Sequence, residues 1–357
     1  MVEYKKLGEV CTFNRGRTIT AKDAVEGEIP VIAGGQTPSY YHNESNRTGE
    51  SITVAGSGAY AGFISYWNQP IFVSDAFTID PSNLLIHKYL YHWLKRNQEK
   101  VFATQKGAGV PHVHGKDIAN FLIPILSISE QQRIVGILDT FTSSIDNLKQ
   151  QITQRRKQYE YYRDQLLDLE GKEGVEMKTL GEIGEVCMCK RIMKDQTAAN
   201  GEIPFFKIGT FGGQADAYIT RELYEDYKAR FSFPKKGEIL ISAAGTIGRA
   251  VVFDGEDAYF QDSNIVWIAN DEKLVTNRYL YYFYQIAEWK TDGGTIKRLY
   301  NYNLKNTTIP IPSLEEQQRI VSILDTFETT ISNLEQQLTL REKQYEYYRN
   351  KLLTFKE

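Results

Sequence analysis

Two stretches of this chain are nearly the same. Residues 123–141 read IPILSISEQQRIVGILDTF and residues 309–327 read IPIPSLEEQQRIVSILDTF. The likeness continues, without a gap and at a constant offset of 186 residues, to RRKQYEYYRDQLLDL at 155–169 and REKQYEYYRNKLL at 341–353. Self-similarity at a fixed spacing indicates a duplicated structural unit. The chain is therefore predicted to be a tandem repeat.

Within each copy, apolar residues recur in steps of four and three, the a/d spacing of a coiled coil. In the first copy the predicted seam consists of Phe141, Ile145, Leu148, Ile152, Tyr159, Tyr162 and Leu166. In the second copy it consists of Phe327, Ile331, Leu334, Leu338, Tyr345, Tyr348 and Leu352. A helix of about 40 residues is roughly 60 Å long and cannot bury such a seam alone. We expect the two helices to pack against each other.

Each seam is interrupted once, at equivalent positions, by Arg155 and by Arg341. A polar residue at a single seam position commonly costs stability and fixes the register of the helix pair. Alternatively, each arginine stem lies along apolar surface and places its charge at the edge of the seam. The sequence leaves both interpretations open.

The composition narrows the class of protein. The chain has 357 residues, of which 41% are hydrophobic and 24% charged, and this length is enough for two or three domains. Its formal net charge of −3 means that any nucleic-acid binding needs locally basic surfaces or partners that share the phosphate load. Cys11, Cys187 and Cys189 are too few for a disulfide framework, and a zinc site at the last two is disfavoured. Without a signal-peptide-like start or an apolar run of about 18 residues, we expect a cytoplasmic protein.

The regions before the two helices repeat one plan with different residues. In residues 1–122, short apolar runs alternate with Gly, Asn, Ser and Pro, which predicts the short strands of a half-buried sheet. A helical patch follows at 87–100, and residues 172–308 repeat this order loosely. The predicted fold is mixed α/β (α+β), with two α/β domains separated by two long helical regions at 123–171 and 309–357.

The link between the halves, LEGKEGVEMK at 169–178, is short and contains glycine. It can reverse the chain but cannot span a long helix. If the second helix packs back on the first, the two run antiparallel, with one domain at each end and a pseudo-twofold axis between them. One chain then imitates a symmetric dimer whose halves carry different surfaces.

Two similar scaffolds with different surfaces, held at a fixed distance, suit a protein that reads a bipartite DNA site. In dimeric DNA-binding proteins the half-site spacing follows from the geometry of the protein. Because the halves differ here, the site need not be a palindrome, and the helix length would set the number of unread base pairs.

The candidate DNA-reading residues are polar, basic or aromatic side chains of the two variable domains, the types that contact base edges and phosphates. In the first domain they are Arg15, Arg17, Gln36, Thr37, Ser39, Tyr40, Tyr41, Ser57, Tyr60, Lys106, His112, His114 and Lys116. In the second they are Lys190, Arg191, Lys194, Lys207, Thr210, Gln214, Arg249, Gln261, Ser263, Asn264, Lys297, Arg298, Tyr300 and Asn301. Each alone is equally well explained as a solvated surface residue. The paired loops at 106–116 and 293–302 are the stronger candidates.

No catalytic, cofactor or metal site is predicted. His112 and His114 have the spacing of two ligands on one strand face, but no third ligand is evident, and Asp75 and Asp262 are interpreted as turn or cap residues. The sequence lacks a phosphate-binding P-loop, a G-x-S-x-G nucleophile elbow and an Asn-Pro-Pro-aromatic or Asp-Pro-Pro-aromatic motif. GSGAYAG at 56–62 is interpreted as a turn between strands. These absences favour a recognition protein without chemistry of its own.

The duplicated EQQRIVxILDTF and KQYEYYRxxLL motifs, each after an IPI lead-in, resemble the specificity subunit of type I restriction–modification systems over nearly the whole chain. The resemblance implies that each variable region is a target recognition domain, an α/β unit with a curved sheet, for one half of a split DNA site. It implies that the antiparallel helices form a spacer and a docking surface for two methyltransferase subunits, to which motor-nuclease subunits add. It also implies that S-adenosylmethionine is bound by the methyltransferase partners, which flip and methylate an adenine, and that this chain binds no cofactor.

Two other functions are compatible with parts of the sequence. A coiled-coil assembly scaffold would never contact DNA and would show no sequence-selective binding even with partners present. A self-sufficient methyltransferase or nuclease would show cofactor-dependent activity as an isolated chain. Recognition domains of the family are not expected to match one another, so base assignments cannot be carried over.

Overall fold

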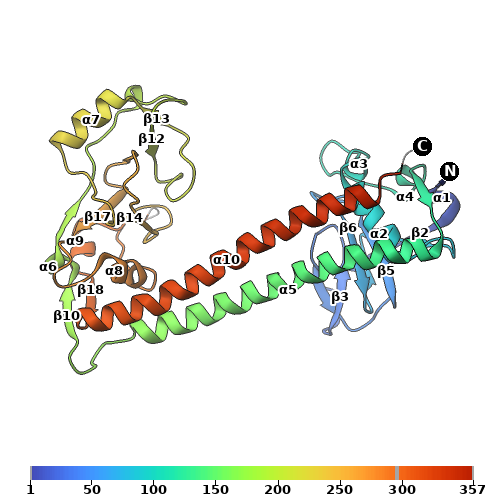
Figure 1. Cartoon of the computed structure of the whole chain (residues 1–357), viewed down its shortest axis with the longest axis horizontal. Coiled ribbons are helices and arrows are strands. Elements are labelled where there is room, and N and C mark those ends of the chain that lie inside the picture. Colours follow the sequence, from blue (N-terminus) through green and yellow to red (C-terminus); the bar gives the residue numbers. More distant parts are fainter. Residues whose placement is uncertain (1, 294–296, 356–357) are drawn as a thin grey trace. The chain divides into compact units, whose positions relative to one another are not determined.

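The computed structural model describes residues 2–293 and 297–355 (Figure 1). The chain divides into two compact units: residues 1–151 with 334–357 form unit 1, and residues 152–333 form unit 2. Each unit therefore holds one globular part together with a segment of each long helix. The division passes through both helices, whereas the sequence repeat divides the chain between them.

The globular part of unit 1 is a mixed α/β domain. Its elements are β1 (Glu3–Lys6), α1 (Leu7–Val10), β2 (Cys11–Arg15), β3 (Ile29–Ile32), β4 (Tyr40–His42), β5 (Glu50–Ala55), β6 (Ile64–Asn68), β7 (Phe72–Val73), β8 (Ala76–Pro81), α2 (His87–Arg96), α3 (Gln98–Phe102), α4 (Gly115–Ile118) and β9 (Leu122–Ile125). An antiparallel sheet has the order β2-β8-β5-β6, and a smaller sheet, β4-β3-β7, contains one parallel pair. The predicted short strands, the helical patch and the turn at 56–62 are confirmed.

The globular part of unit 2 repeats this plan. Its elements are β10 (Glu176–Thr179), α6 (Leu180–Ile183), β11 (Glu185–Cys187), the 3-10 helix η1 (Lys194–Gln196), β12 (Ile203–Phe206), β13 (Tyr218–Ile219), α7 (Arg221–Arg230), β14 (Ile239–Ser242), β15 (Ala250–Val252), β16 (Tyr259–Phe260), β17 (Ile265–Ala269), α8 (Asn277–Tyr284), α9 (Asn301–Lys305) and β18 (Thr308–Ile311). The sheets β11-β17-β14-β15 and β13-β12-β16 correspond strand for strand to those of unit 1. Helix α7 is the main addition, and the sequence analysis did not predict it.

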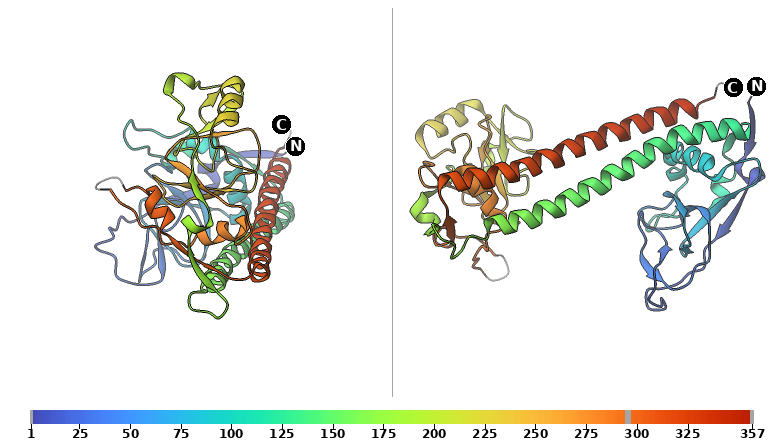
Figure 2. Two further views of the ribbon diagram at one scale, coloured as in Figure 1. Left: turned by 90° about the vertical axis from the view of Figure 1, so that its left-hand side faces the viewer. Right: turned by 60° about the horizontal axis from the view of Figure 1, so that its bottom comes forward.

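The long helices are α5 (Ile128–Leu167, 40 residues) and α10 (Leu314–Leu352, 39 residues). Figures 1 and 2 show them side by side and running in opposite directions within each unit. In unit 1, the Phe141 ring stacks on Tyr348 and Lys149 pairs with Glu342, so residue numbers rise along one helix as they fall along the other. The predicted antiparallel packing of the two helices is confirmed in each unit.

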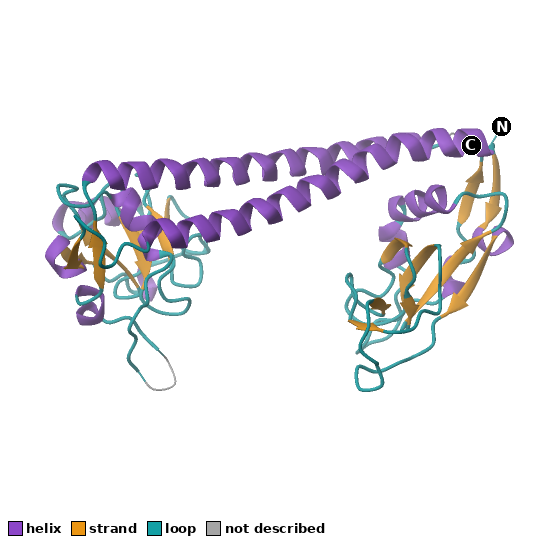
Figure 3. Cartoon of the chain, turned by 90° about the horizontal axis from the view of Figure 1, so that it is seen from below, coloured by secondary structure: helices purple, strands orange, loops and turns teal. Residues whose placement is uncertain are grey.

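The first turns of each long helix lie in the core of a globular part. Ile134 and Leu138 of α5 are fully buried with Tyr89 and Trp93 of α2 and with Ile52 of β5. In unit 2, α10 contributes its first turns to a core built from β14, β17 and α8 in the same way. Figure 3 shows the strands confined to the globular parts that these helices enter. In each unit, hydrophobic packing therefore anchors the long helix to the globular part, in addition to the contacts that the two long helices make with each other.

A two-stranded antiparallel ladder closes each globular part. Strand β1 pairs with β9, which leads into α5, and β10 pairs with β18, which leads into α10. These ladders explain why the IPI lead-in and the EYKK or EMKT segment occur together in both halves. The predicted boundaries at 122/123 and 308/309 fall at β9 and β18, and they stay predictions.

Candidate nucleic-acid interface

The helix seams contain the same aromatic arrangement in both units. In unit 1, the Phe141 ring lies 5.1 Å from Tyr348 and 5.8 Å from the Arg341 guanidinium. In unit 2, the Phe327 ring lies 5.6 Å from Tyr162 and 5.9 Å from the guanidinium of Arg155. Each phenylalanine of one helix is thus held by an arginine and a tyrosine that are seven residues apart on the other helix.

Both seam arginines are half-buried against the seam, and the two interpretations of their role stay predictions. Arg155 donates a 2.9 Å hydrogen bond to Gln158, and Arg341 donates one of the same length to Gln344. The guanidinium, which carries the charge, faces a phenylalanine ring of the seam in a cation–π arrangement.

The other predicted seam residues are buried to different degrees. Ile145 and Ile152 are 7% and 8% exposed. Tyr162 and Tyr348 remain 44% and 39% exposed although they stack on phenylalanine rings. The half-buried members of the seam are Phe141, Leu148, Tyr159, Leu166, Phe327, Ile331, Leu334, Leu338, Tyr345 and Leu352. A pair of helices without a covering layer leaves its seam edges open to water in this way.

Two buried glutamines, which sequence reasoning missed, fix each globular part to its helix. The Gln131 amide accepts from the Ile86 N–H and donates to the carbonyls of Leu84 and Leu126. Gln317 makes the equivalent three hydrogen bonds: its amide oxygen accepts from the Thr276 N–H, and its amide nitrogen donates to the carbonyls of Leu274 and Pro312. Both side chains are fully buried, and their bonds satisfy backbone groups that would otherwise be unpaired. The sequence signal that could have revealed them is that both occupy the same position of the repeated EQQR motif.

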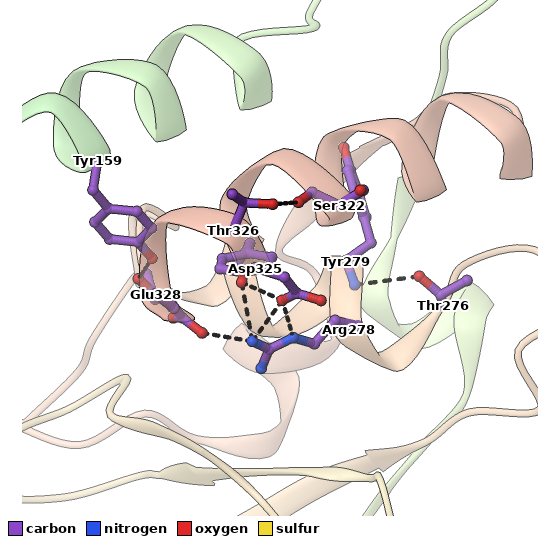
Figure 4. A network of polar contacts seen from close by, with 10 residues as sticks. Tyr159, Thr276, Arg278, Tyr279, Ser322, Asp325, Thr326 and Glu328 are labelled. Atoms are coloured by element: carbon purple, nitrogen blue, oxygen red, sulfur yellow. Dashed lines mark hydrogen bonds and ion pairs between the residues drawn. The ribbon is translucent and has the colours of Figure 1, made fainter. Parts of the chain in front are cut away.

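A second attachment joins α2 or α8 to an aspartate of the long helix. In unit 1, Asp139 accepts from Lys88 at 2.5 Å and lies 3.1 Å from the His92 ring. In unit 2, Arg278 pairs with Asp325 and Glu328, and the Tyr282 hydroxyl donates to Asp325 at 2.5 Å. Figure 4 shows Arg278 pointing at both carboxylates. We call these contacts the aspartate clamps.

The electrostatics of the clamps differ between the units. Burial disfavours the charged form of Asp139, but hydrogen bonds from His92 and Lys88 outweigh it and lower the pKa of this carboxyl. Burial lowers the pKa of His92, against the opposing effect of Asp139. Burial and the hydrogen bond to Asp325 raise the pKa of Tyr282. The first clamp therefore contains an imidazole, whose pKa burial holds below its ordinary value, and the second contains a phenol whose pKa is raised.

The structure brings candidate residues from distant parts of the first globular part together at one end of its sheets. Ser57 forms a β-bridge with His112, which forms another with Lys106. The Ser57 hydroxyl donates to Asp75, and a Cβ placed on Gly34 would lie 2.3 Å from the Ser57 carbonyl oxygen. Close backbone approach explains the glycine at this position. The segments 15–17, 33–35, 56–58, 74–75 and 106–112 form what we call the first loop edge.

Equivalent segments form the second loop edge, at 190–191, 207–208, 243–245, 261–264 and 298–300. Arg298 donates to the carbonyl of Ser263 and to the Asn264 side chain, and Arg191 pairs with Asp262. The backbone of Leu299 donates to Ala243, as Val113 donates to Gly56 in unit 1. Residues 294–296 of the predicted loop 293–302 lie outside the described residues.

Several predicted reading residues have structural partners. Arg298 and Asn264 bond each other, Arg249 donates to the Phe211 carbonyl, and the Tyr40 hydroxyl donates to the Ile19 carbonyl. Among the candidate cations, Lys207 pairs with Asp216, Lys106 pairs with Asp117, Arg17 lies near Glu44, and Lys190 covers the Phe231 ring. The Thr210 hydroxyl bonds the backbone of Lys207, and the Gln261 side chain accepts from the Ile208 N–H. These partners shape the loops and take part of each side chain's hydrogen-bonding capacity.

Other candidates are exposed. They are Arg15, Gln36, Thr37, Ser39, Tyr41, Tyr60, His112, His114, Lys116, Lys194, Gln214, Lys297, Tyr300 and Asn301. The rings of His112 and His114 stack with centroids 6.4 Å apart, and those of Tyr300 and Tyr302 do so at 6.0 Å. Lys194 lies in η1 and Gln214 lies between β12 and β13, outside the five segments of the second loop edge.

Asp75 and Asp262 lie in these loop edges, where Asp75 accepts from the Ser57 hydroxyl and Asp262 pairs with Arg191. Their interpretation as turn or cap residues stays a prediction. In the part of the chain that the structure describes, no three His, Cys, Asp or Glu side chains are grouped to hold a metal ion. No helix among the described residues is both long and apolar enough to span a membrane.

Comparison with known proteins identifies the family. The family model for the type I restriction modification DNA specificity domain matches residues 1–155 and again residues 172–341. The chain belongs to this family. Members are specificity subunits, the non-catalytic recognition subunits of restriction–modification systems, which confirms the predicted class.

Similar proteins cover the chain almost completely. A putative type I restriction enzyme specificity subunit from Haemophilus influenzae is 43% identical, over 99% of this chain and 96% of its own length. The EcoR124I/EcoR124II specificity subunit of Escherichia coli is 29% identical, over 99% of this chain and 94% of its own length. The crystal structure of the specificity subunit from M. genitalium matches the fold with a TM-score of 0.69 at 17% identity, over 100% of this chain and 97% of the other.

Proposed function

We propose that this specificity subunit reads a split, asymmetric DNA site, one half with each globular part, and holds two methyltransferase subunits on that site. The observation that carries the proposal is the contrast between the repeats. Both globular parts place loops from the same five places on one edge, but the side chains on those edges differ. A common scaffold with different exposed residues is what two different half-sites require.

The partner surface is proposed from exposed residues that are identical in both long helices. Each of the following pairs is exposed at both positions: Gln132 and Gln318, Arg133 and Arg319, Thr140 and Thr326, Asn147 and Asn333, Gln150 and Gln336, Gln151 and Gln337, Lys157 and Lys343, Glu160 and Glu346, Tyr161 and Tyr347. Packing within the chain does not require identity at exposed positions. A partner that binds twice, once to each helix, does.

The partners supply the chemistry in this proposal. The methyltransferase subunits bind S-adenosylmethionine and methylate the flipped adenine, and motor-nuclease subunits add to this core. A solved structure with a similar fold, matched with a TM-score of 0.57 at 18% identity, addresses complex assembly and conformational transition of the type I restriction–modification system. The net charge of −3 fits a subunit whose partners clamp part of the phosphate backbone. The proposal places this complex in the cytoplasm.

The test is to co-express the chain with its cognate methyltransferase subunit and to map methylated adenines over a plasmid library by single-molecule sequencing. The expected result is a split motif with two different halves and a fixed gap. An assembled, S-adenosylmethionine-loaded complex that methylates nothing would contradict DNA reading and favour the assembly scaffold.

A further inference from the structure

Helices α2 and α8 occupy equivalent places, and one pair of equivalent residues differs in kind. The Tyr89 hydroxyl donates to the Pro124 carbonyl at 3.0 Å, and Tyr279 donates to Pro310 at the same distance. One turn further along each helix, His92 faces Asp139 and Tyr282 faces Asp325. Histidine in the first aspartate clamp therefore replaces the tyrosine of the second.

The His92 ring joins three helices. It is 1% exposed; its Nε2 lies 3.1 Å from Asp139 on α5, and its Nδ1 lies 2.9 Å from the Tyr345 hydroxyl on α10. A neutral ring satisfies both contacts, because Nε2–H donates to the carboxylate and Nδ1 accepts from the tyrosine O–H. The side chain of His92 on α2 therefore contacts both α5 and α10.

Charged and titratable groups face His92 from every helix packed around it. They are Lys88 and Tyr91 on α2, Asp139 on α5, and Tyr345 and Arg349 on α10. Asp146 of α5 and Glu342 of α10 line the hollow beside them. Asp139 favours a protonated ring, whereas burial, Lys88 and Arg349 disfavour it. The net effect is a lowered pKa of His92, so the ring is neutral at pH 7.

A second proton is disfavoured in this arrangement. It would add a positive charge to a buried ring beside Lys88 and Arg349, and the Tyr345 hydroxyl would have to turn so that its oxygen accepts from the new N–H at Nδ1. The clamp borders a hollow of about 430 Å³, lined in part by Tyr66, Tyr91 and Tyr345. If the clamp opened toward this hollow, water could solvate the charged ring and reduce the cost of burying its charge.

We propose that His92 is a pH-sensitive positioning residue, whose protonation loosens the packing of the first globular part against the long helices. Tyr282, at the equivalent position, leaves the packing of the second globular part insensitive to pH over the same range. The loosening is local to unit 1. It does not depend on which DNA is read or on the partners proposed above.

The pH window follows from the direction of the shift. A base whose pKa is lowered by folding contributes stability that is complete above its ordinary value of 6.5 and is lost as the pH falls below that value. The lowered pKa of Asp139 acts only below its ordinary value of 3.8. Tyr282, with a raised pKa, stays protonated at neutral and acidic pH. Between pH 7.5 and 5.5, His92 is therefore the group, among His92, Asp139 and Tyr282, whose protonation changes when the clamp opens.

The test is hydrogen–deuterium exchange of the full chain at pH 7.5 and 5.5, with labelling times scaled for the intrinsic rate. The protection of α2 is expected to fall by up to about tenfold, relative to α8, because one pH unit below the ordinary pKa changes the opening equilibrium tenfold. In His92→Tyr this fall should disappear. In Tyr282→His a fall of the same kind should appear in α8.

The control is His87→Gln, on the same helix, where the ring is partly exposed and lies 3.7 Å from Glu50. This variant should keep the wild-type pH response of α2. Unchanged α2 protection in the wild type, or an equal fall in His92→Tyr, would overturn the proposal. If His92→Tyr fails to fold, the transfer of pH sensitivity by Tyr282→His decides, and its failure to appear counts against His92.

Discussion

The long helices and the globular parts differ in how alike their two copies are. In the helices, many exposed positions are identical, as at Tyr161 and Tyr347. In the globular parts the strand order is shared but the loop edges carry different side chains, such as His112 in one and Arg298 in the other. This difference is what the proposed function requires, because helices that bind one kind of partner twice need the same surface twice, whereas domains that read two different half-sites need different surfaces.

The largest effect is expected from breaking the helix seam. Ile145→Asp combined with Leu334→Asp places two carboxylates in the packed segment of unit 1 and should cost about 3 kcal/mol or more of unfolding free energy. Assembly with methyltransferase partners should be lost as well. Urea unfolding followed by circular dichroism, with size-exclusion chromatography of the complex, measures both. Leu340→Asp, the same kind of change at an exposed position that differs between the two copies, is the control. Wild-type assembly of the double variant would disprove the packing role.

The next effect concerns the buried glutamines. Gln131→Leu leaves the Ile86 N–H and two carbonyls without a partner, and each such group costs about 1–3 kcal/mol. Hydrogen exchange should show the first globular part loosening from α5 while unit 2 keeps its protection. Gln132→Leu, one residue along and exposed, should change little. Equal exchange in the two variants would mean that Gln131 does not fix the domain.

These two predictions show what could and could not be read from the sequence. Period and repetition are local signals, so the helices, the seam and the short strands were predicted. Burial of Gln131 and the convergence of Ser57 with His112 depend on contacts between residues far apart in the chain. The hydrogen bond from Arg298 to Asn264 could not be predicted for the same reason, because the two residues are far apart in the sequence. Helix α7 was missed because the first half has no counterpart from which to infer it.

A smaller effect is expected at the loop edge and its flank. Lys106→Ala with Lys116→Ala should weaken DNA binding by the assembled complex and reduce the salt dependence by about one unit of slope per lost phosphate contact. Fluorescence anisotropy at several salt concentrations measures this. Lys236→Ala, at the opposite end of β14 from the second loop edge, serves as the control. An unchanged slope in the double variant would remove these lysines from the interface.

The smallest effect is expected from a seam arginine. Arg341→Ala removes the guanidinium from the face of Phe141 and should cost about 1 kcal/mol of unfolding free energy. The nearby exposed Lys343→Ala should cost less. The urea midpoint distinguishes them, and a stabilised Arg341→Ala variant would show that the arginine is tolerated there and not favourable.

The central claim is that the helices set the spacing and the globular parts read the bases. Insertion of one heptad into each long helix adds about 10 Å of helix, close to three base pairs. Single-molecule sequencing of DNA methylated by the wild-type and the inserted complex tests this claim most directly. The account predicts the same two half-sites separated by a longer gap. Altered half-sites with an unchanged gap would contradict it.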